Sequence, residues 1–387
     1  MWQKSARYLD SNAGAGLDPY VRKKLIEILQ TEEFFFANPS SRHRLGQKVQ
    51  QHLYFATETV AKCVQAQANQ LIFTSSGTEA NQTVIQSCRS NHDAWVVGGG
   101  EHSSTYDYFL HLPKTAEVSL LADGSHDWTA LRDVLEVART QGRKKVFLSL
   151  TWVNHETGVI TDLAVLRQVI QSSGLEVTLH LDAAQAWGKI ALDFQSSPAQ
   201  FVTLSGHKIG APAGTGVIWA RNPAQLHPLI QGSQGNGLRG GTENVLGILG
   251  LGYAAEKVDP LQYQSTVAPL RNEFENALLD SGILHRVWGK EALRVANTSR
   301  ISFLNFKTYQ NWVELLDLRG FAVSHGSACK SKVVEPSRVL LQMGAAEGEA
   351  LNSIRVSFSA SVTKQDGIGL VHAIREIHSL KTSEARP

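Results

Sequence analysis

The stretch Phe201-Val202-Thr203-Leu204-Ser205-Gly206-His207-Lys208 is the most informative part of this sequence. It begins with a short, largely apolar run, and Lys208 lies just beyond the end of that run. A lysine in this place can hold a carbonyl cofactor covalently if burial or a neighbouring cation lowers the pKa of its amine. Taken alone, such a stretch is more often an exposed loop, so the rest of the sequence decides between the two interpretations.

A carboxylate ends the preceding apolar run, Val177-Thr178-Leu179-His180-Leu181-Asp182. The carboxyl end of a strand in an α/β sheet faces the ligand crevice, so Asp182 is expected to point towards a bound group. If that group is pyridoxal phosphate, an aspartate here pairs with the pyridinium nitrogen and keeps it protonated. The alternative is a helix N-cap ahead of Ala183-Ala184-Gln185, and both interpretations stay open at this point.

A strand, a tight turn and the start of a helix are expected where Gln70-Leu71-Ile72-Phe73-Thr74 precedes Ser75-Ser76-Gly77-Thr78-Glu79-Ala80-Asn81. Small residues at such a junction let backbone N–H groups approach a phosphate, whose charge the helix dipole favours. Gly77 and Thr78 are the candidates for this contact. The alternative is a capping box between Ser76 and Glu79 with no ligand at all.

These three segments occur in the order phosphate cup, pyridinium acid and lysine, and this order resembles that of the fold-type I pyridoxal phosphate enzymes. The resemblance narrows to the cysteine desulfurases of the class-V aminotransferase family, in the class with the long catalytic loop. The motifs that carry it extend from about residue 8 to about residue 360. They are Asn38-Pro39-Ser40-Ser41 with His43, Glu101-His102, Asn154-His155-Glu156-Thr157-Gly158, Asp182-Ala183-Ala184-Gln185, Ser205-Gly206-His207-Lys208, Leu238-Arg239-Gly240-Gly241-Thr242-Glu243-Asn244-Val245, Gly326-Ser327-Ala328-Cys329 and Ile354-Arg355-Val356-Ser357.

The resemblance implies an α/β fold with a mostly parallel central sheet, helices on both faces and a smaller α/β C-terminal domain. It implies a large cofactor-binding domain at residues 16–255, and a small domain of residues 1–15 and 256–387 that carries the catalytic-cysteine loop. Apolar runs at residues 94–97, 145–150 and 177–181 agree with buried parallel strands. Helical patterns alternate with them, for example at residues 162–170 with Thr161 as the expected N-cap, and after Asp18-Pro19.

The resemblance also implies a role for each matching residue around pyridoxal phosphate. Lys208 is identified as the Schiff-base lysine, which later moves protons on the substrate. His102 resembles the histidine that stacks on the cofactor ring and takes part in proton transfer. The other implied contacts are Asp182 to the pyridinium nitrogen, Gln185 to the ring hydroxyl, Gly77, Thr78, Ser205 and His207 to the phosphate, and Thr242 to the phosphate of the neighbouring subunit in a homodimer.

The substrate implied by the resemblance is L-cysteine, which would leave as L-alanine after its sulfur has formed a persulfide on Cys329. Arg355 resembles the arginine that binds the substrate carboxylate, assisted by Asn38 and Asn154. The attacking group is a thiolate, and from adjacency alone we predict that His325 and Lys330 lower the pKa of Cys329. The long interval from Cys329 to Arg355 resembles the class that supplies sulfur to an acceptor or scaffold protein for iron–sulfur assembly or for tRNA and cofactor thiolation.

Other functions on this fold differ in the residues they need. A carbon–sulfur lyase acting on cysteine or cystine needs no protein nucleophile, so Cys329 argues against it. A selenocysteine lyase uses almost the same site and stays open. An aminotransferase would use Lys208 and Asp182 without Cys329, whereas a non-catalytic binding partner in sulfur transfer would have no need of Lys208, Asp182, His102 and Arg355.

Composition limits the partners that we expect. The 387 residues contain 37 basic and 35 acidic side chains, which argues against a dedicated nucleic-acid or membrane surface. We find neither a signal peptide nor an apolar run of spanning length, so a cytoplasmic protein is expected. The cysteines Cys63, Cys88 and Cys329 are too few and too scattered for a disulfide framework or a metal cluster, and Cys63 and Cys88 are expected to be structural.

Overall fold

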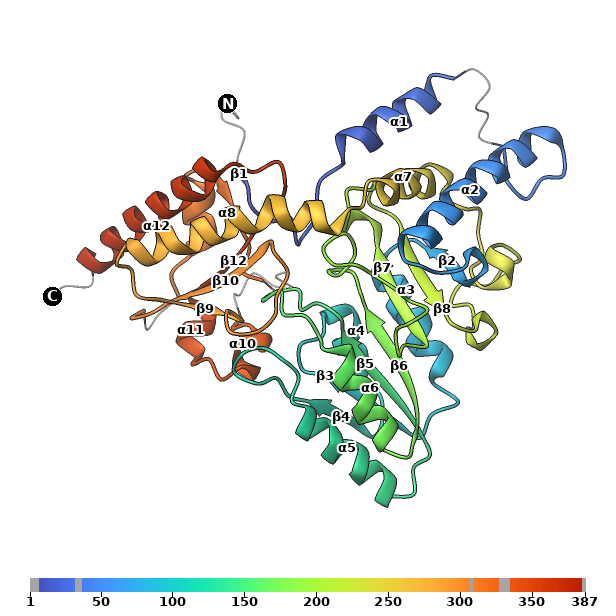
Figure 1. Ribbon diagram of the computed structural model, residues 1–387, viewed down its shortest axis with the longest axis horizontal. Helices are drawn as coiled ribbons and strands as arrows, with labels where there is room; N and C mark the ends of the chain where they lie inside the picture. Colours follow the sequence, from blue (N-terminus) through green and yellow to red (C-terminus); the bar gives the residue numbers. More distant parts are fainter. Residues whose placement is uncertain (1–6, 32–36, 307–308, 327–334, 385–387) are drawn as a thin grey trace.

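The computed structural model describes residues 7–31, 37–306, 309–326 and 335–384. Figure 1 shows a larger region on the right, built around a seven-stranded sheet, and a smaller region on the left, built around a three-stranded sheet. Helix α8 (Pro260–Asp280) extends between the two regions, and α12 (Lys364–Glu384) lies beside it. The predicted domain boundaries near residues 15 and 255 stay a prediction.

The larger sheet is mostly parallel, as expected. Its order across the sheet is β2 (Leu71–Thr74), β8 (Gly216–Ala220), β7 (Phe201–Ser205), β6 (Glu176–Asp182), β5 (Lys145–Thr151), β3 (Ala94–Gly98) and β4 (Thr115–Val118). Strand β8 is antiparallel to both of its neighbours, and the strands from β7 to β4 are mutually parallel. The carboxyl ends of β2, β5, β6 and β7 therefore lie at the same edge of the sheet.

Helices cover both faces of this sheet, which confirms the second part of the fold prediction. Successive strand residues point to opposite faces, so Trp95 and Phe147 pack into one apolar cluster while Val96 and Leu148 pack into another. The first cluster includes residues of α3 (Gly77–Cys88) and α4 (Ser103–Phe109). The second includes residues of α2 (Arg44–Cys63), α5 (Trp128–Thr140), α6 (Leu163–Ser172) and α7 (Val245–Glu256).

Helix starts follow the capping chemistry of the sequence, with one correction. Helix α1 (Pro19–Leu29) begins as predicted, with Asp18 as N-cap and proline in the first turn. The predicted N-cap of α6, Thr161, was wrong, because the carboxylate of Asp162 accepts the N–H groups of the first turn instead. The Thr161 hydroxyl donates to the Thr151 carbonyl at 2.6 Å, so this side chain is engaged with the sheet.

The smaller region has its own sheet and its own apolar core. Strand β10 (Thr298–Phe303) lies between β12 (Ser353–Ser357) and β9 (His285–Trp288) and is antiparallel to both. Its side chains pack with those of α8, α12 and α9 (Trp312–Asp317). Helices α10 (Arg338–Gln342) and α11 (Glu347–Leu351) precede β12, and the N-terminal strand β1 (Arg7–Tyr8) pairs in parallel with β11 (Phe321–Ala322).

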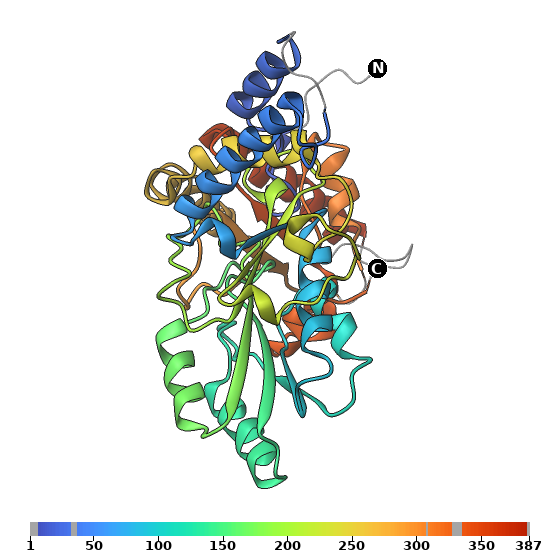
Figure 2. The ribbon, with the colours of Figure 1, turned by 90° about the vertical axis from the view of Figure 1, so that its right-hand side faces the viewer.

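The view in Figure 2 places α1 and α2 at one end of the molecule and α5 at the opposite end, as in Figure 1. Among the residues that the structure describes, no helix combines the length and the apolar character needed to cross a membrane. The chain continues from β1 into residues 9–14, which reach from the smaller region towards the edge of the larger sheet. This N-terminal segment therefore contributes to both regions.

Candidate active site

A cavity of about 300 Å³ lies at the carboxyl edge of the larger sheet, where residues of the smaller region and of the N-terminal segment meet it. Most of the residues predicted to bind the cofactor line this cavity. Its lining residues are Asn12, Ala13, Ser76, Gly77, Thr78, Asn81, His102, Ser104, Thr151, His155, Asp182, Ala184, Gln185, Ser205, His207, Lys208, Ser324, Gly326 and Arg355.

Lys208 lies one short turn beyond the end of β7, with its amine in the cavity. The ammonium donates to the backbone carbonyls of Asn12 at 2.6 Å and Ala13 at 2.9 Å. Burial and the neighbouring Arg355 lower the pKa of Lys208 to about 8. A useful fraction of the amine is therefore neutral near physiological pH, as covalent attachment to an aldehyde requires.

Asp182 ends β6 and presents its carboxylate to the cavity through a hydrogen-bonded network. One oxygen accepts from the Ala184 N–H at 2.9 Å, and the other accepts from the Asn81 amide, also at 2.9 Å. The residues after Asp182 form a turn, so the carboxylate caps a turn and still faces the cavity. Asn81 receives a hydrogen bond from the Thr203 hydroxyl, which fixes the amide that holds Asp182.

Asn81 is a site residue that the sequence did not reveal. It lies one helical turn after Gly77 on α3, so it shares the face that begins at the predicted phosphate cup. The four-residue spacing from Gly77 is the sequence signal that could have identified Asn81. Its partner Thr203 lies on β7, and the contact between them depends on how α3 packs on the sheet.

The predicted capping box at α3 is half present. Ser76 is the N-cap, and its hydroxyl accepts from the Glu79 N–H at 3.1 Å. The Glu79 carboxylate does not return to Ser76; it accepts from the Ser75 N–H at 2.7 Å and pairs with Arg239 at 3.0 Å. Capping and ligand binding are compatible here, because the cap occupies the Glu79 N–H and leaves the first helical N–H groups to other partners.

The start of α3 forms a cradle suited to an anion. Gly77 and Thr78 occupy the first two helical positions, where backbone N–H groups have no helical acceptor. A Cβ atom on Gly77 would lie 3.1 Å from the Ser205 Cβ, so glycine permits the close approach of α3 to β7. The Ser205 hydroxyl lies 3.0 Å from Nδ1 of His207. The cavity thus gathers the four predicted phosphate contacts in one place.

Two histidine rings meet on another side of the cavity. His102 is the N-cap of α4, where its Nδ1 accepts from the Ser104 N–H at 3.1 Å. The ring of His155 lies edge-on to it, with ring centroids 5.2 Å apart. Burial holds the pKa of His155 well below its usual range, and the nearby cations Arg355, Arg338 and Lys208 lower it further. A neutral His155 therefore supports the ring predicted to stack on the cofactor.

Arg355 extends from β12 and is held in the cavity wall by three acceptors. Its guanidinium donates to the carbonyls of His155 at 3.0 Å and Gly326 at 3.1 Å, and to the Asp10 carboxylate at 2.7 Å. Its side chain is only 4% exposed. Asp10 is a second residue that sequence reasoning missed, because it precedes its partner by 345 positions.

Asn154, predicted to assist at the substrate, is committed to a turn. Its side-chain oxygen accepts from the N–H groups of Glu156 at 2.9 Å and Thr157 at 3.0 Å, and its amide donates to the Gly100 carbonyl at 3.1 Å. It is 3% exposed and is not among the residues that line the cavity. Its position supports the shape of the site, and contact with a substrate stays a prediction.

Two further predicted residues also lie outside this cavity. Asn38 is exposed, and its side chain accepts from the Ser40 N–H at 2.9 Å. Thr242 is exposed at the wall of a different cavity of about 990 Å³, together with Tyr54 and Arg239. An exposed Thr242 is compatible with the predicted contact to a neighbouring subunit, which stays a prediction.

Cys329 and Lys330 lie outside the described residues, whereas His325 lies within them. Burial and the charge of Arg300 lower the pKa of His325 to about 4, so its ring is uncharged at neutral pH. Its two ring nitrogens lie 2.8 Å from the Tyr309 hydroxyl and 3.1 Å from the Ser353 carbonyl. An uncharged ring gives no support to the prediction that His325 and Lys330 lower the pKa of Cys329, which stays a prediction.

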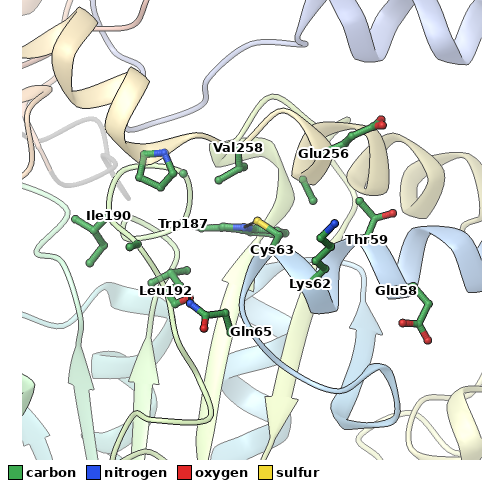
Figure 3. A pocket seen from close by; sticks show the side chains of 14 residues that line it. Glu58, Thr59, Lys62, Cys63, Gln65, Trp187, Ile190, Leu192, Glu256 and Val258 are labelled. Atoms are coloured by element: carbon green, nitrogen blue, oxygen red, sulfur yellow. Dashed lines mark hydrogen bonds between the residues drawn. The ribbon is translucent and has the colours of Figure 1, made fainter.

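The other cysteines have structural surroundings, as expected. Cys63 ends α2 and accepts a hydrogen bond from the Trp187 indole at 3.4 Å, in a separate cavity that is drawn in Figure 3. Burial raises the pKa of Cys63, and it raises the pKa of Cys88 on α3 to about 12. Neither thiol is a ready nucleophile at neutral pH.

The sequence match decides the family. Residues 7–367 match the family described as Aminotransferase class-V. The chain belongs to the class-V aminotransferase family. Enzymes of this family depend on pyridoxal phosphate, and the lowered pKa of Lys208, the carboxylate of Asp182 and the cradle at Gly77 fit that cofactor.

Relatives and solved structures of this family agree over nearly the whole chain. A cysteine desulfurase of Gluconacetobacter diazotrophicus is 33% identical over 371 residues, which cover 94% of this chain and 90% of the relative. Cysteine desulfurase NifS of Azotobacter vinelandii is 31% identical over 388 residues, with coverage of 96% and 91%. The structure of a NifS-like protein from Rickettsia africae superposes with a TM-score of 0.86 at 27% identity, covering 97% of this chain and 99% of that one. The predicted resemblance and the predicted fold-type I architecture are thereby confirmed.

Proposed function

We propose that this class-V enzyme is a cysteine desulfurase that converts L-cysteine to L-alanine and retains the sulfur as a persulfide on Cys329. The observation that carries the proposal is the meeting of Lys208, Asp182 and Arg355 in one cavity of a chain whose relatives are named cysteine desulfurases. Asp182 supports cofactor chemistry, and Arg355 supports an amino-acid carboxylate. Lys208 supplies the amine for covalent attachment of the cofactor.

Each wall of the cavity has a distinct binding task in this proposal. Gly77, Thr78, Ser205 and His207 hold the phosphate, and Asp182 keeps a proton on the pyridinium nitrogen. Gln185 donates to the ring hydroxyl, and His102 covers the ring. Arg355 binds the substrate carboxylate through its planar fork, because its contacts to two carbonyls and to Asp10 fix the orientation of that fork.

Lys208 has two tasks, attachment and proton transfer. When bound, pyridoxal phosphate acts as an electron sink for bonds next to the substrate amino group. Lys208, displaced by the amino group of L-cysteine, then takes the proton from the substrate Cα and returns protons to carbon. Its lowered pKa, about 8, suits both directions of transfer near neutral pH.

Cys329 supplies the nucleophile for sulfur transfer. Its thiolate donates an electron pair to the substrate sulfur, so an S–S bond forms while the substrate Cβ–S bond breaks and leaves its electron pair on the carbon side. A proton then goes to Cβ, and L-alanine leaves with the extra hydrogen in place of sulfur. No external oxidant is needed for this step. A reductant or an acceptor thiol later removes the sulfur from Cys329.

The proposal extends to partners and location. Thr242 reaches the phosphate of a second copy, so the working enzyme is a homodimer. An acceptor or scaffold protein takes the sulfur for iron–sulfur cluster assembly or for tRNA and cofactor thiolation. A cytoplasmic location agrees with this use of sulfur.

The test is the release of alanine and sulfide from L-cysteine in the presence of a thiol reductant. We expect both products from the wild-type enzyme and neither from Lys208→Ala or Cys329→Ala. Cys63→Ala is the matched control, because its thiol lies outside the cofactor cavity, and it should retain activity. Full activity in Cys329→Ala together with none in Lys208→Ala would instead indicate a carbon–sulfur lyase and contradict the proposal.

A further inference from the structure

A second lysine, Lys189, is buried beside the cofactor cavity and contacts the cavity residue Gln185. Its residue is 7% exposed, and no carboxylate of the described residues forms an ion pair with its amine. Burial, together with the positive charges of Lys208 and Arg355, holds its pKa well below that of an exposed lysine. A buried amine costs stability unless its hydrogen bonds are satisfied, so its contacts show what it does in the fold.

Those contacts end on two residues of the site. The Lys189 amine donates to the side-chain oxygen of Asn12 at 2.7 Å and to the side-chain oxygen of Gln185. The Gln185 amide nitrogen donates to the Asn12 backbone carbonyl at 2.9 Å, and Lys208 donates to that same carbonyl. Asn12 thus joins both lysines and Gln185 in one hydrogen-bonded group.

This hydrogen-bonded group fixes the orientation of the Gln185 side-chain amide. Its oxygen faces the donors of Lys189, and its nitrogen faces the carbonyl of Asn12. The reverse orientation would place donor against donor and acceptor against acceptor, so it is excluded by both neighbours. The Gln185 nitrogen carries two hydrogens, and Asn12 uses one of them. The other is available to a group in the cavity that Gln185 lines.

The backbone turn around Gly188 directs the side chain of Lys189 away from those of Trp187 and Ile190. Trp187 and Ile190, labelled in Figure 3, line the separate cavity around Cys63, whereas Lys189 is not among the residues of that cavity. Gly188 has φ +77°, a conformation that favours glycine, and the turn lets Lys189 reach Asn12. The short turn therefore directs the apolar side chains of Trp187 and Ile190 towards the cavity around Cys63 and the Lys189 amine towards Asn12.

We propose that Lys189 is a positioning residue, which holds the Gln185 amide with its N–H towards the ring hydroxyl of the cofactor. The inference rests on the proposed contact between Gln185 and that hydroxyl. A donor held at the ring oxygen stabilises its phenolate form, so it eases loss of the proton from the nitrogen that joins Lys208 to the cofactor. Lys189 acts in either protonation state, because a neutral amine still has two N–H groups.

The test uses the absorbance of the cofactor-loaded protein as a function of pH, without substrate. In Lys189→Met the amine is lost and the apolar bulk is kept, so we expect the midpoint of the spectral change to rise by about half a unit to one unit. Gln185→Ala should raise it at least as far. The double variant should match Gln185→Ala alone, since Lys189 works through Gln185.

The exposed Lys144 provides the matched control, and Lys144→Met should leave the midpoint unchanged. An unmoved midpoint in Lys189→Met, or full additivity with Gln185→Ala, would overturn the inference. If Lys189→Met does not fold, Lys189→Gln replaces it, because its shorter side chain cannot reach both acceptors; a raised midpoint supports the inference and an unchanged one overturns it. Wild-type protein that binds no cofactor would contradict the proposed function itself, which distinguishes that failure from a failure of Lys189 alone.

Discussion

The two walls of the cofactor cavity are built in different ways. The sheet wall carries Asp182 at the end of β6, Lys208 just beyond β7 and Gly77 at the start of α3, so each residue lies where its own strand or helix ends. The opposite wall joins Arg355 of β12 to Asp10, which is 345 positions away in the sequence. The first wall follows from local sequence and sheet order, whereas the second exists only when the N-terminal segment is in place.

Lys208 lies under the influence of both walls. Burial lowers its pKa most, Arg355 lowers it further, and the carboxylates of Asp10 and Asp182 oppose that effect. A substitution in either wall should therefore change the pKa of the Lys208 amine. Substitutions in the two walls should differ in their effects on the cofactor and on the substrate.

The largest effect is expected on the sheet wall, in Asp182→Asn. The amide cannot keep the pyridinium nitrogen protonated, so kcat for desulfuration should fall by a factor of about 10²–10⁴. The new amide also faces the Asn81 amide, and we expect the free energy of unfolding to fall by about 1–3 kcal/mol. Steady-state kinetics and urea unfolding measure the two effects.

Asp162→Asn is the matched control for this change, because Asp162 is an exposed N-cap of α6 outside the cavity. Its kinetics should equal those of the wild type. Equal kcat values for Asp182→Asn and the wild type would remove Asp182 from the chemistry and leave it as a turn cap.

The next largest effect is expected on the opposite wall, in Arg355→Lys. Lysine keeps the charge but cannot reproduce the planar fork that reaches Asp10 and two carbonyls. The KM for L-cysteine should rise by about tenfold to a hundredfold, while the cofactor content stays that of the wild type. Arg294→Lys, in an ion pair with Glu275 outside the cavity, is the control. Loss of the cofactor in Arg355→Lys would show that the two walls do not divide their tasks as stated.

The smallest effect concerns the pH at which the cofactor attaches to cofactor-free protein. Only the neutral amine of Lys208 reacts, so the rate should rise about tenfold per pH unit below the pKa and level off above about 8. In Arg355→Met one of the influences that lower this pKa is gone, and the midpoint should move upwards by about half a unit. Stopped-flow absorbance across the pH range measures this midpoint. A downward shift in Arg355→Met would contradict the conclusion that the charge of Arg355 lowers the pKa of Lys208.

The sequence predicted one wall better than the other, for physical reasons. That Lys208, Asp182 and Gly77 lie at one cavity could be predicted because strand ends and helix starts leave local patterns. Asp10, Asn81 and Lys189 were missed because their partners come from other strands and from the N-terminal segment. The burial of His325, which keeps its ring uncharged, could not be predicted from adjacency in the sequence.

The proposed transfer of sulfur to Cys329 can be tested by mass spectrometry of the protein after a short exposure to L-cysteine. Wild-type enzyme without reductant should gain sulfur on the peptide that contains Cys329, with the peptides of Cys63 and Cys88 unchanged. Lys208→Ala should show no such gain. Sulfur on Cys63 or Cys88, or alanine formed with no sulfur on Cys329, would contradict the account.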